Sequence, residues 1–137
     1  MKNPIEIIKN GEAMVAIILY ADFHEPGVHF FTPKEFPQQL GFLAHPKGHS
    51  IEPHIHNIVK REISLTQEVL FVRKGKLRVD LYDSQRRYLE SRELQAGDVI
   101  LLAEQGHGYE ALEDVEVVEI KQGPYLEEND KIRFPRP

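Results

Sequence analysis

Short apolar runs separated by turn residues, without any long amphipathic helix pattern, limit the fold of this chain more than any other feature. In the clearest run, Lys76–Tyr82, the residues Leu77, Val79 and Leu81 alternate with polar residues. Alternation with a period of two places apolar side chains on one face of a strand and polar side chains, here including Asp80, on the other. There are about nine such runs, which predicts an all-β antiparallel sandwich or barrel.

The other strand-like runs are spread along the whole chain. They are Met14–Tyr20, Val28–Phe31, Leu40–His45, Glu68–Arg73, Arg87–Leu94, Val99–Leu102 and Val115–Ile120. We expect Val28–Phe31 to pair with Met14–Tyr20, because Glu25-Pro26-Gly27 predicts a turn between them. A further turn is predicted at Lys74-Gly75. No internal repeat or low-complexity linker divides the sequence, so we predict a single domain over residues 1–137.

Composition excludes several classes of protein and of site. The chain has no cysteine, so any metal must bind imidazole or carboxylate groups. A formal net charge of −5 argues against nucleic-acid binding. The polar segment Lys2-Asn3-Pro4 precedes no signal-peptide core, and the longest apolar run, Met14–Leu19, is far shorter than the roughly 20 residues that span a bilayer. We therefore expect a cytoplasmic protein with a small-molecule ligand and no nucleic-acid or membrane partner.

Three segments carry residues suited to metal binding. In His54-Ile55-His56, two imidazoles are separated by one residue, so in a strand both would point to the same face and could bind one ion. Glu68 begins an otherwise apolar strand face, where a carboxylate needs a partner. His107 follows the apolar run Val99–Leu102 through a short loop. Taken singly, these residues are also compatible with exposed strand histidines, a solvated carboxylate and a loop histidine bonded to backbone.

The spacing of these residues resembles the two motifs of the cupin superfamily. Gly48 with five residues before His54-x-His56, followed by Glu68 with six residues before Gly75, is similar to the first motif. Gly97-Asp98, an apolar run and Gly106-His107 are similar to the second. The resemblance implies a double-stranded β-helix, or jelly-roll antiparallel barrel, with its metal-binding core over residues 41–122.

The same resemblance implies one divalent metal bound by His54, His56, Glu68 and His107. The chain departs from the family pattern at two places. Eleven residues separate His56 from Glu68, where the family has only a few, and Ala103 occupies the usual proline position, with His107 one residue early. Small single-domain cupins occur among polysaccharide biosynthesis genes, and this chain looks like one of them.

Three imidazoles and one carboxylate suit Fe, Mn, Ni, Zn or Cu, and the sequence does not choose among these metals. Four protein ligands leave two positions of an octahedral ion open to a substrate. We expect an enzyme that acts on a small polar substrate, either an isomerase or epimerase of a sugar derivative or a dioxygenase. The alternatives are a non-catalytic sugar-binding or sensing module and a purely structural metal. Candidate substrate-binding residues are Arg61, Tyr109 and Glu119.

The run Met14–Leu19 is more apolar than one strand of a small barrel requires. Small cupins commonly form dimers. We therefore expect a homodimer that covers an otherwise exposed sheet edge or face.

Overall fold

The computed structural model describes residues 4–127 and 131–136, and it is built from ten strands, with no α-helix in this part of the chain. The strands are β1 (Ile5–Asn10), β2 (Ala13–Leu19), β3 (Gly27–Phe30), β4 (Gly41–Ala44), β5 (Glu68–Lys74), β6 (Lys76–Tyr82), β7 (Tyr88–Gln95), β8 (Val99–Leu102), β9 (Gly106–Ala111) and β10 (Glu116–Lys121). All pairings are antiparallel. The predicted all-β antiparallel class is therefore confirmed. None of these residues forms a helix long and apolar enough to cross a membrane.

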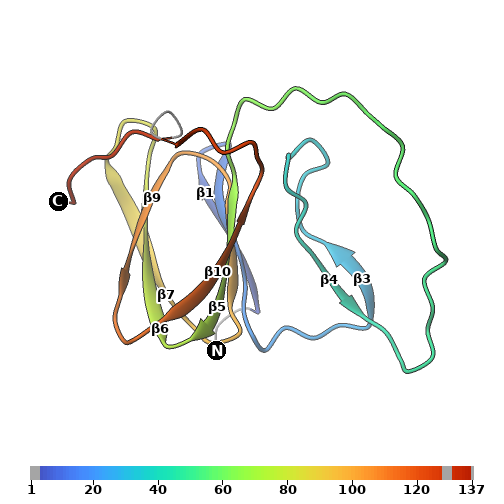
Figure 1. Cartoon of the computed structure of the whole chain (residues 1–137). Coiled ribbons are helices and arrows are strands. Elements are labelled where there is room, and N and C mark those ends of the chain that lie inside the picture. The colour runs from blue at the N-terminus through green and yellow to red at the C-terminus, as the bar shows by residue number, and fades with distance from the viewer. Residues whose placement is uncertain (1–3, 128–130, 137) are drawn as a thin grey trace.

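The strands form a sandwich and a separate hairpin (Figure 1). A five-stranded sheet in the order β1-β2-β8-β5-β10 faces a three-stranded sheet in the order β7-β6-β9. The third sheet contains only β3 and β4. The expected pairing of Val28–Phe31 with Met14–Tyr20 is wrong, because β3 pairs with β4 while β2 lies between β1 and β8. The described residues do not close into a barrel.

The core lies between the two facing sheets. The predicted inward residues of β6, Leu77, Val79 and Leu81, are all buried, and Leu70 of β5 packs in the same cluster. Asp80 differs from the expectation of a solvated outer face, since its side chain is only 5% exposed. It is buried because Arg78, Arg136 and Ser91 surround its carboxylate.

One edge of the sandwich is closed by polar contacts. Arg92 of β7 donates to both carboxylate oxygens of Glu6 on β1, at 2.8–3.1 Å. The hydroxyl of Tyr20 donates to the same carboxylate at 2.7 Å. These contacts join the two sheets at the β1–β7 edge.

The outer face of the large sheet is covered at β2 and β8 by the chain itself. Phe31, Phe36 and Leu40, which lie between β3 and β4 or at their ends, pack on Ile17 of β2 and Leu101 of β8. The apolar run Met14–Leu19 is thus buried on both faces within one chain. It does not supply the exposed surface from which a dimer was expected.

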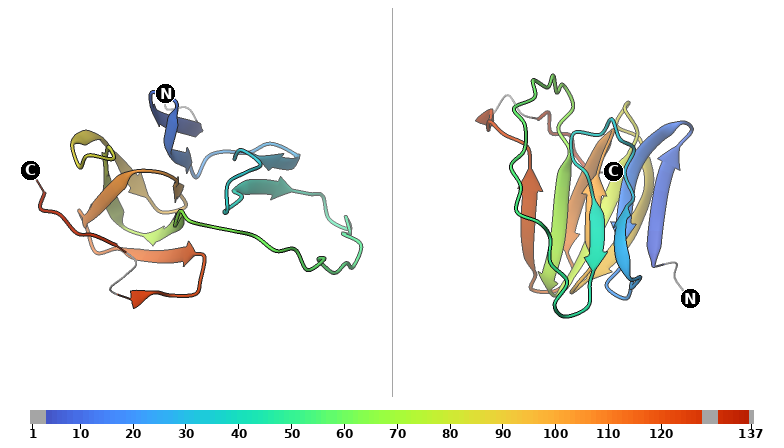
Figure 2. Two further views of the ribbon diagram at one scale, coloured as in Figure 1. Left: turned by 90° about the horizontal axis from the view of Figure 1, so that it is seen from above. Right: turned by 90° about the vertical axis from the view of Figure 1, so that its right-hand side faces the viewer.

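The hairpin and the chain that follows it lie to one side of the sandwich in two perpendicular views (Figures 1 and 2). After β4, residues 45–67 form no strand, and the chain returns to the sandwich at β5. Most side chains of this segment are exposed.

Candidate functional site

Glu68 and His107 come from different strands and lie together at the end of the sandwich. Nε2 of His107 is 3.5 Å from Oε2 of Glu68. Glu68 is the first residue of β5 and is buried, while the His107 side chain near the start of β9 is 29% exposed. Two of the four predicted metal ligands are therefore adjacent.

The registers explain why these two side chains point between the sheets. His107 lies opposite Leu81 in the β6–β9 pair, and directly opposed residues share a face. Glu68 shares its face of β5 with Leu70, two residues further along. Since Leu81 and Leu70 belong to the core, His107 and Glu68 face the interior.

Two further inward residues complete this group. Tyr109 of β9 lies opposite Val79 of β6. Glu119 of β10 lies opposite Leu70 of β5. Lys121 pairs with Glu68, so β10 remains regular to its end and both Glu119 and Lys121 face inward.

The carboxylates influence each other. A hydrogen bond with His107 lowers the pKa of Glu68 to about 2, and its own burial opposes this shift only in part. Partial burial and the hydrogen bond to Glu68 raise the pKa of Glu119. The pair consequently consists of one strongly acidic carboxyl group and one group that holds its proton more tightly.

These residues line a cavity of about 700 Å³ between β9 and β10. Its wall includes Tyr82, His107, Tyr109, Glu119, Lys131, Arg133, Phe134 and Arg136. The basic side chains from the C-terminal segment were not predicted as site residues. The closely spaced basic residues Lys131, Arg133 and Arg136 near the end of the sequence were the available signal. Arg136 is fixed by Asp80 at 3.3 Å and by the carbonyl of Tyr109 at 3.0 Å.

His54 and His56 are not brought to this cavity. Both are exposed, and they lie in the 45–67 segment rather than in a strand. Their rings are 5.2 Å apart, and Nδ1 of His54 donates to the carbonyl of Glu52 at 2.9 Å. In the neutral ring this bond leaves Nε2 of His54 as the free electron-pair donor. Within residues 4–127 and 131–136, no group of three or more His, Asp and Glu side chains is placed to hold a metal ion.

Arg61 lies in a different place from the other predicted site residues. It lines a cavity of about 830 Å³ between residues 34–39 and residues 61–67, together with Gln67 and Glu104. The side chain therefore does not share a cavity with Tyr109 and Glu119.

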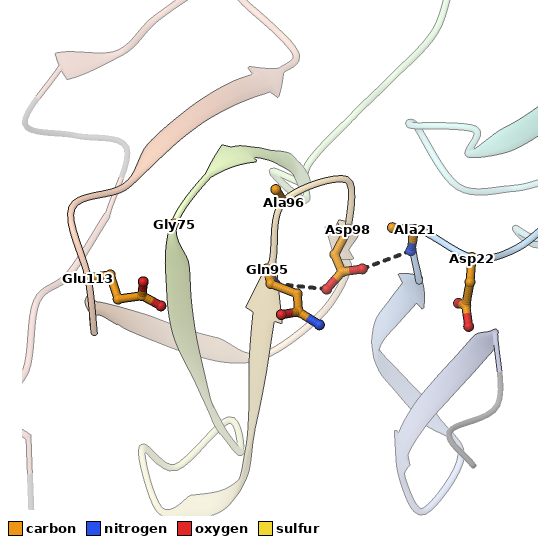
Figure 3. A pocket seen from close by; sticks show the side chains of 7 residues that line it. All are labelled: Ala21, Asp22, Gly75, Gln95, Ala96, Asp98 and Glu113. Atoms are coloured by element: carbon orange, nitrogen blue, oxygen red, sulfur yellow. Dashed lines mark hydrogen bonds between the residues drawn. The ribbon is translucent and has the colours of Figure 1, made fainter.

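A third cavity, of about 490 Å³, lies at the opposite end of the strands (Figure 3). Its buried carboxylate, Asp98, accepts from the backbone nitrogens of Ala21 and Gln95, each at 2.8 Å. Because both oxygens are already bonded, Asp98 fixes the turn between β7 and β8 rather than offering a binding group. Glu113 and Asp22 lie on opposite sides of this cavity in Figure 3.

The separation of Glu68 and His107 suits a shared metal ion. In an octahedral site with two open positions, adjacent donors that each lie about 2.1 Å from the ion are about 3.0 Å apart. The observed 3.5 Å is about 0.5 Å longer, so a small movement of the two side chains would bring both donors to one ion. The donor set of imidazole and carboxylate is also the one that the cysteine-free sequence allows.

Comparisons of the chain with protein-family models, with curated proteins and with solved structures gave no match.

Proposed function

We propose that the chain is a small metal-binding cupin that acts on an anionic sugar derivative. Its metal would be held by Glu68 and His107 on the sandwich, and by His54 and His56 from the 45–67 segment. The observation that carries the proposal is the adjacency of Glu68 and His107 in the interior, because the spacing of the two cupin-like motifs requires it. A jelly-roll barrel is proposed with it, and the support for it is that two antiparallel sheets face each other.

A divalent metal bound to these four residues would supply Lewis acidity to a substrate oxygen. The surrounding side chains of this chain have their own roles. Arg133 would orient a carboxylate or phosphate group, and Tyr109 would contact the sugar. Glu119, whose pKa is raised, would accept and return the proton that an isomerisation or epimerisation moves. This proton-transfer group favours an isomerase or epimerase over a dioxygenase.

The test of the metal assignment is elemental analysis of freshly purified protein at neutral pH. We expect one equivalent of transition metal per chain in the wild type, and less than one tenth of this in His54→Ala/His56→Ala and in Glu68→Gln. The matched control is His24→Ala/His29→Ala, which removes two imidazoles beside and on β3 and should leave the stoichiometry unchanged. Full metal content in the His54→Ala/His56→Ala variant would refute the assignment.

The catalytic part needs a second measurement. Glu119→Gln should keep the metal but lose, by a factor of at least about 100, the exchange of substrate C–H hydrogen with solvent deuterium. The probes are sugar phosphates and uronic acids that carry a keto group. If the metal-loaded wild type binds one of these sugars and exchanges no hydrogen, the non-catalytic binding module is the correct alternative.

A further inference from the structure

The chain after residue 40 leaves many apolar side chains in solvent. We call residues 41–66, which comprise β4 and the segment after it, the arm. Exposed apolar residues of the arm are Leu43, Ile51, Ile55, Ile58, Val59, Ile63 and Leu65, and Ile55 is 92% exposed. Val28 and Phe30 of the paired strand β3 are also exposed. So many exposed apolar side chains on one segment indicate that another protein surface covers this segment.

The sandwich has two unpaired strand edges that lie side by side. In the described residues, β10 ends the large sheet and β9 ends the small sheet, and each has a strand neighbour on one side only. Tyr109 of β9 and Glu119 of β10 line the same cavity, which is open between these edges. Unpaired edges of this kind bind further strands.

The arm provides what the two edges lack. β4 is a strand with one free edge, and it could extend the large sheet at β10. The sequence around His54-Ile55-His56 alternates, so as a strand beside β9 it would direct both imidazoles inward next to His107, with Ile55 on the outer face. The same addition would bring the four predicted metal ligands together.

The position of the arm's root determines which sandwich it can join. Leu40 packs on Leu101 of β8, and β4 begins at the next residue, Gly41. The vacant place beyond β10 is three strand spacings from β8, roughly 14 Å away. The first strand of the arm, β4, could pair with β10 of its own chain only if Leu40 left its apolar contacts, whereas Ser64 and Leu65 at the far end of the arm line the cavity of their own chain. A second copy of the chain can receive the arm while this root remains in place.

Two other observations fit a second copy. The outer face of the large sheet near β10 is apolar and exposed at Phe71, Val118 and Ile120, so a second copy would cover it. At the junction of arm and sandwich, Nε2 of the buried Gln67 has no hydrogen-bond partner among the described residues. A fully formed core rarely leaves such a donor unpaired.

Size also matches. The length of the arm is comparable to the roughly 20–30 residues that each partner contributes to a stable interface.

We propose that two copies of this chain exchange their arms. Each sandwich receives β4 of the other copy at β10, and residues around His54 and His56 of the other copy at β9. The metal site then contains Glu68 and His107 from one copy and both imidazoles from its partner. This assignment of the site rests on the proposed function, whereas the exchange itself rests on the edges and the arm.

The first experiment detects exchange without reference to metal, and uses the absence of native cysteine. Ile55→Cys chains and Gly108→Cys chains are refolded together and treated with a short bismaleimide. Ile55 on the arm and Gly108 on β9 would both face outward, and a side chain at Gly108 meets only Arg136 Nη2, at 3.6 Å. We expect a cross-linked species of twice the 15.9 kDa chain mass that contains both variants.

The control outcomes of this experiment are decisive. A chain carrying both cysteines that cross-links only within itself at 15.9 kDa, together with no mixed product from the single variants, would overturn arm exchange. Glu12→Cys, in the β1–β2 turn, replaces Gly108→Cys as the matched control and should give no product with Ile55→Cys.

The second experiment assigns the shared site. His54→Ala/His56→Ala chains are mixed with Glu68→Gln/His107→Ala chains, and the mixed dimer is isolated through two different tags. Exchange predicts one complete site, hence about one metal ion per mixed dimer, while each variant alone binds less than one tenth of an equivalent. A mixed dimer without metal, when the wild type binds it, would refute the shared site. If the wild type binds no metal but the cross-link forms, the proposed function fails and arm exchange stands.

Discussion

Asp80 shows how this small sandwich accommodates a buried charge. Its carboxylate accepts from Arg78 Nε at 2.9 Å, from Ser91 Oγ at 2.6 Å and from Arg136 Nε at 3.3 Å. Burial alone would raise the pKa of Asp80, but the hydrogen bonds from Arg78 and Ser91 outweigh it and hold this pKa below its ordinary value. Arg78 is therefore part of a polar network around the buried Asp80 and not a solvated outer-face residue.

The depressed pKa of Asp80 predicts a loss of stability in acid. Because the pKa is lower in the folded than in the unfolded state, the contribution is fully present above about pH 4 and is lost as the pH falls through the folded-state value. We expect Asp80→Asn to lower the free energy of unfolding by roughly 1–2 kcal/mol at pH 7 and by much less at pH 2. Urea titrations at the two pH values measure the difference.

A variant with the same stability loss at both pH values would contradict this linkage. Glu113→Gln is the control, since Glu113 is exposed and no ion pair is recorded for it within the described residues.

At the scale of elements, the turn between β5 and β6 depends on Gly75. Its φ of +84° favours glycine, and an added Cβ would meet the backbone carbonyl of Asp114. Gly11, in the turn between β1 and β2, also has a positive φ, of +62°, but an added Cβ there would meet nothing within 4 Å. Comparison of the two positions thus separates the cost of the left-handed backbone conformation from the cost of a steric clash.

We expect Gly11→Ala to cost about 1 kcal/mol, because only the left-handed conformation opposes it. Gly75→Ala should cost at least about 2 kcal/mol more, since the chain after β9 must move away from the turn. Chemical denaturation of both variants measures the difference. Equal losses would show that the Asp114 segment moves freely and that packing at this turn is weak.

At the scale of the whole molecule, the exchange of arms makes stability depend on chain concentration. Unfolding of a dimer releases two chains, so dilution favours the unfolded state. We expect the thermal midpoint to fall by several degrees between 100 μM and 1 μM chain, and each tenfold dilution to correspond to about 1.4 kcal/mol of dimer stability. Differential scanning calorimetry at several concentrations gives the slope.

The matched variant is Ile55→Ser/Ile58→Ser, which weakens only the apolar arm. We expect a lower midpoint at every concentration for this variant, and a 15.9 kDa particle in sedimentation at micromolar concentration. A wild-type midpoint that is constant over the whole range would indicate a folded monomer.

The sequence by itself determined most of the strands, although not β1 and β9, and it determined which residues of the clearest strand face inward. Leu77, Val79 and Leu81 point inward as their alternation predicts, and Lys74-Gly75 forms the predicted turn. Local patterns suffice for these features because side-chain direction in a strand has a period of two, and because a positive φ at a turn favours glycine. The proximity of Glu68 to His107 was expected only from the spacing of the two motifs.

Pairing between distant segments was decided only by the tertiary structure. The partner of β3 is β4 rather than β2, the inward position of Glu119 follows from the β5–β10 register, and Arg133 and Arg136 reach the cavity from the C-terminal segment. None of these has a local signature, since each depends on which strands lie side by side. The same holds for His54 and His56, whose spacing is suited to a strand although the single chain offers no neighbouring strand to make one. Backbone hydrogen bonds to a neighbour hold a strand extended, and within the described residues the segment around His54 and His56 has no strand beside it.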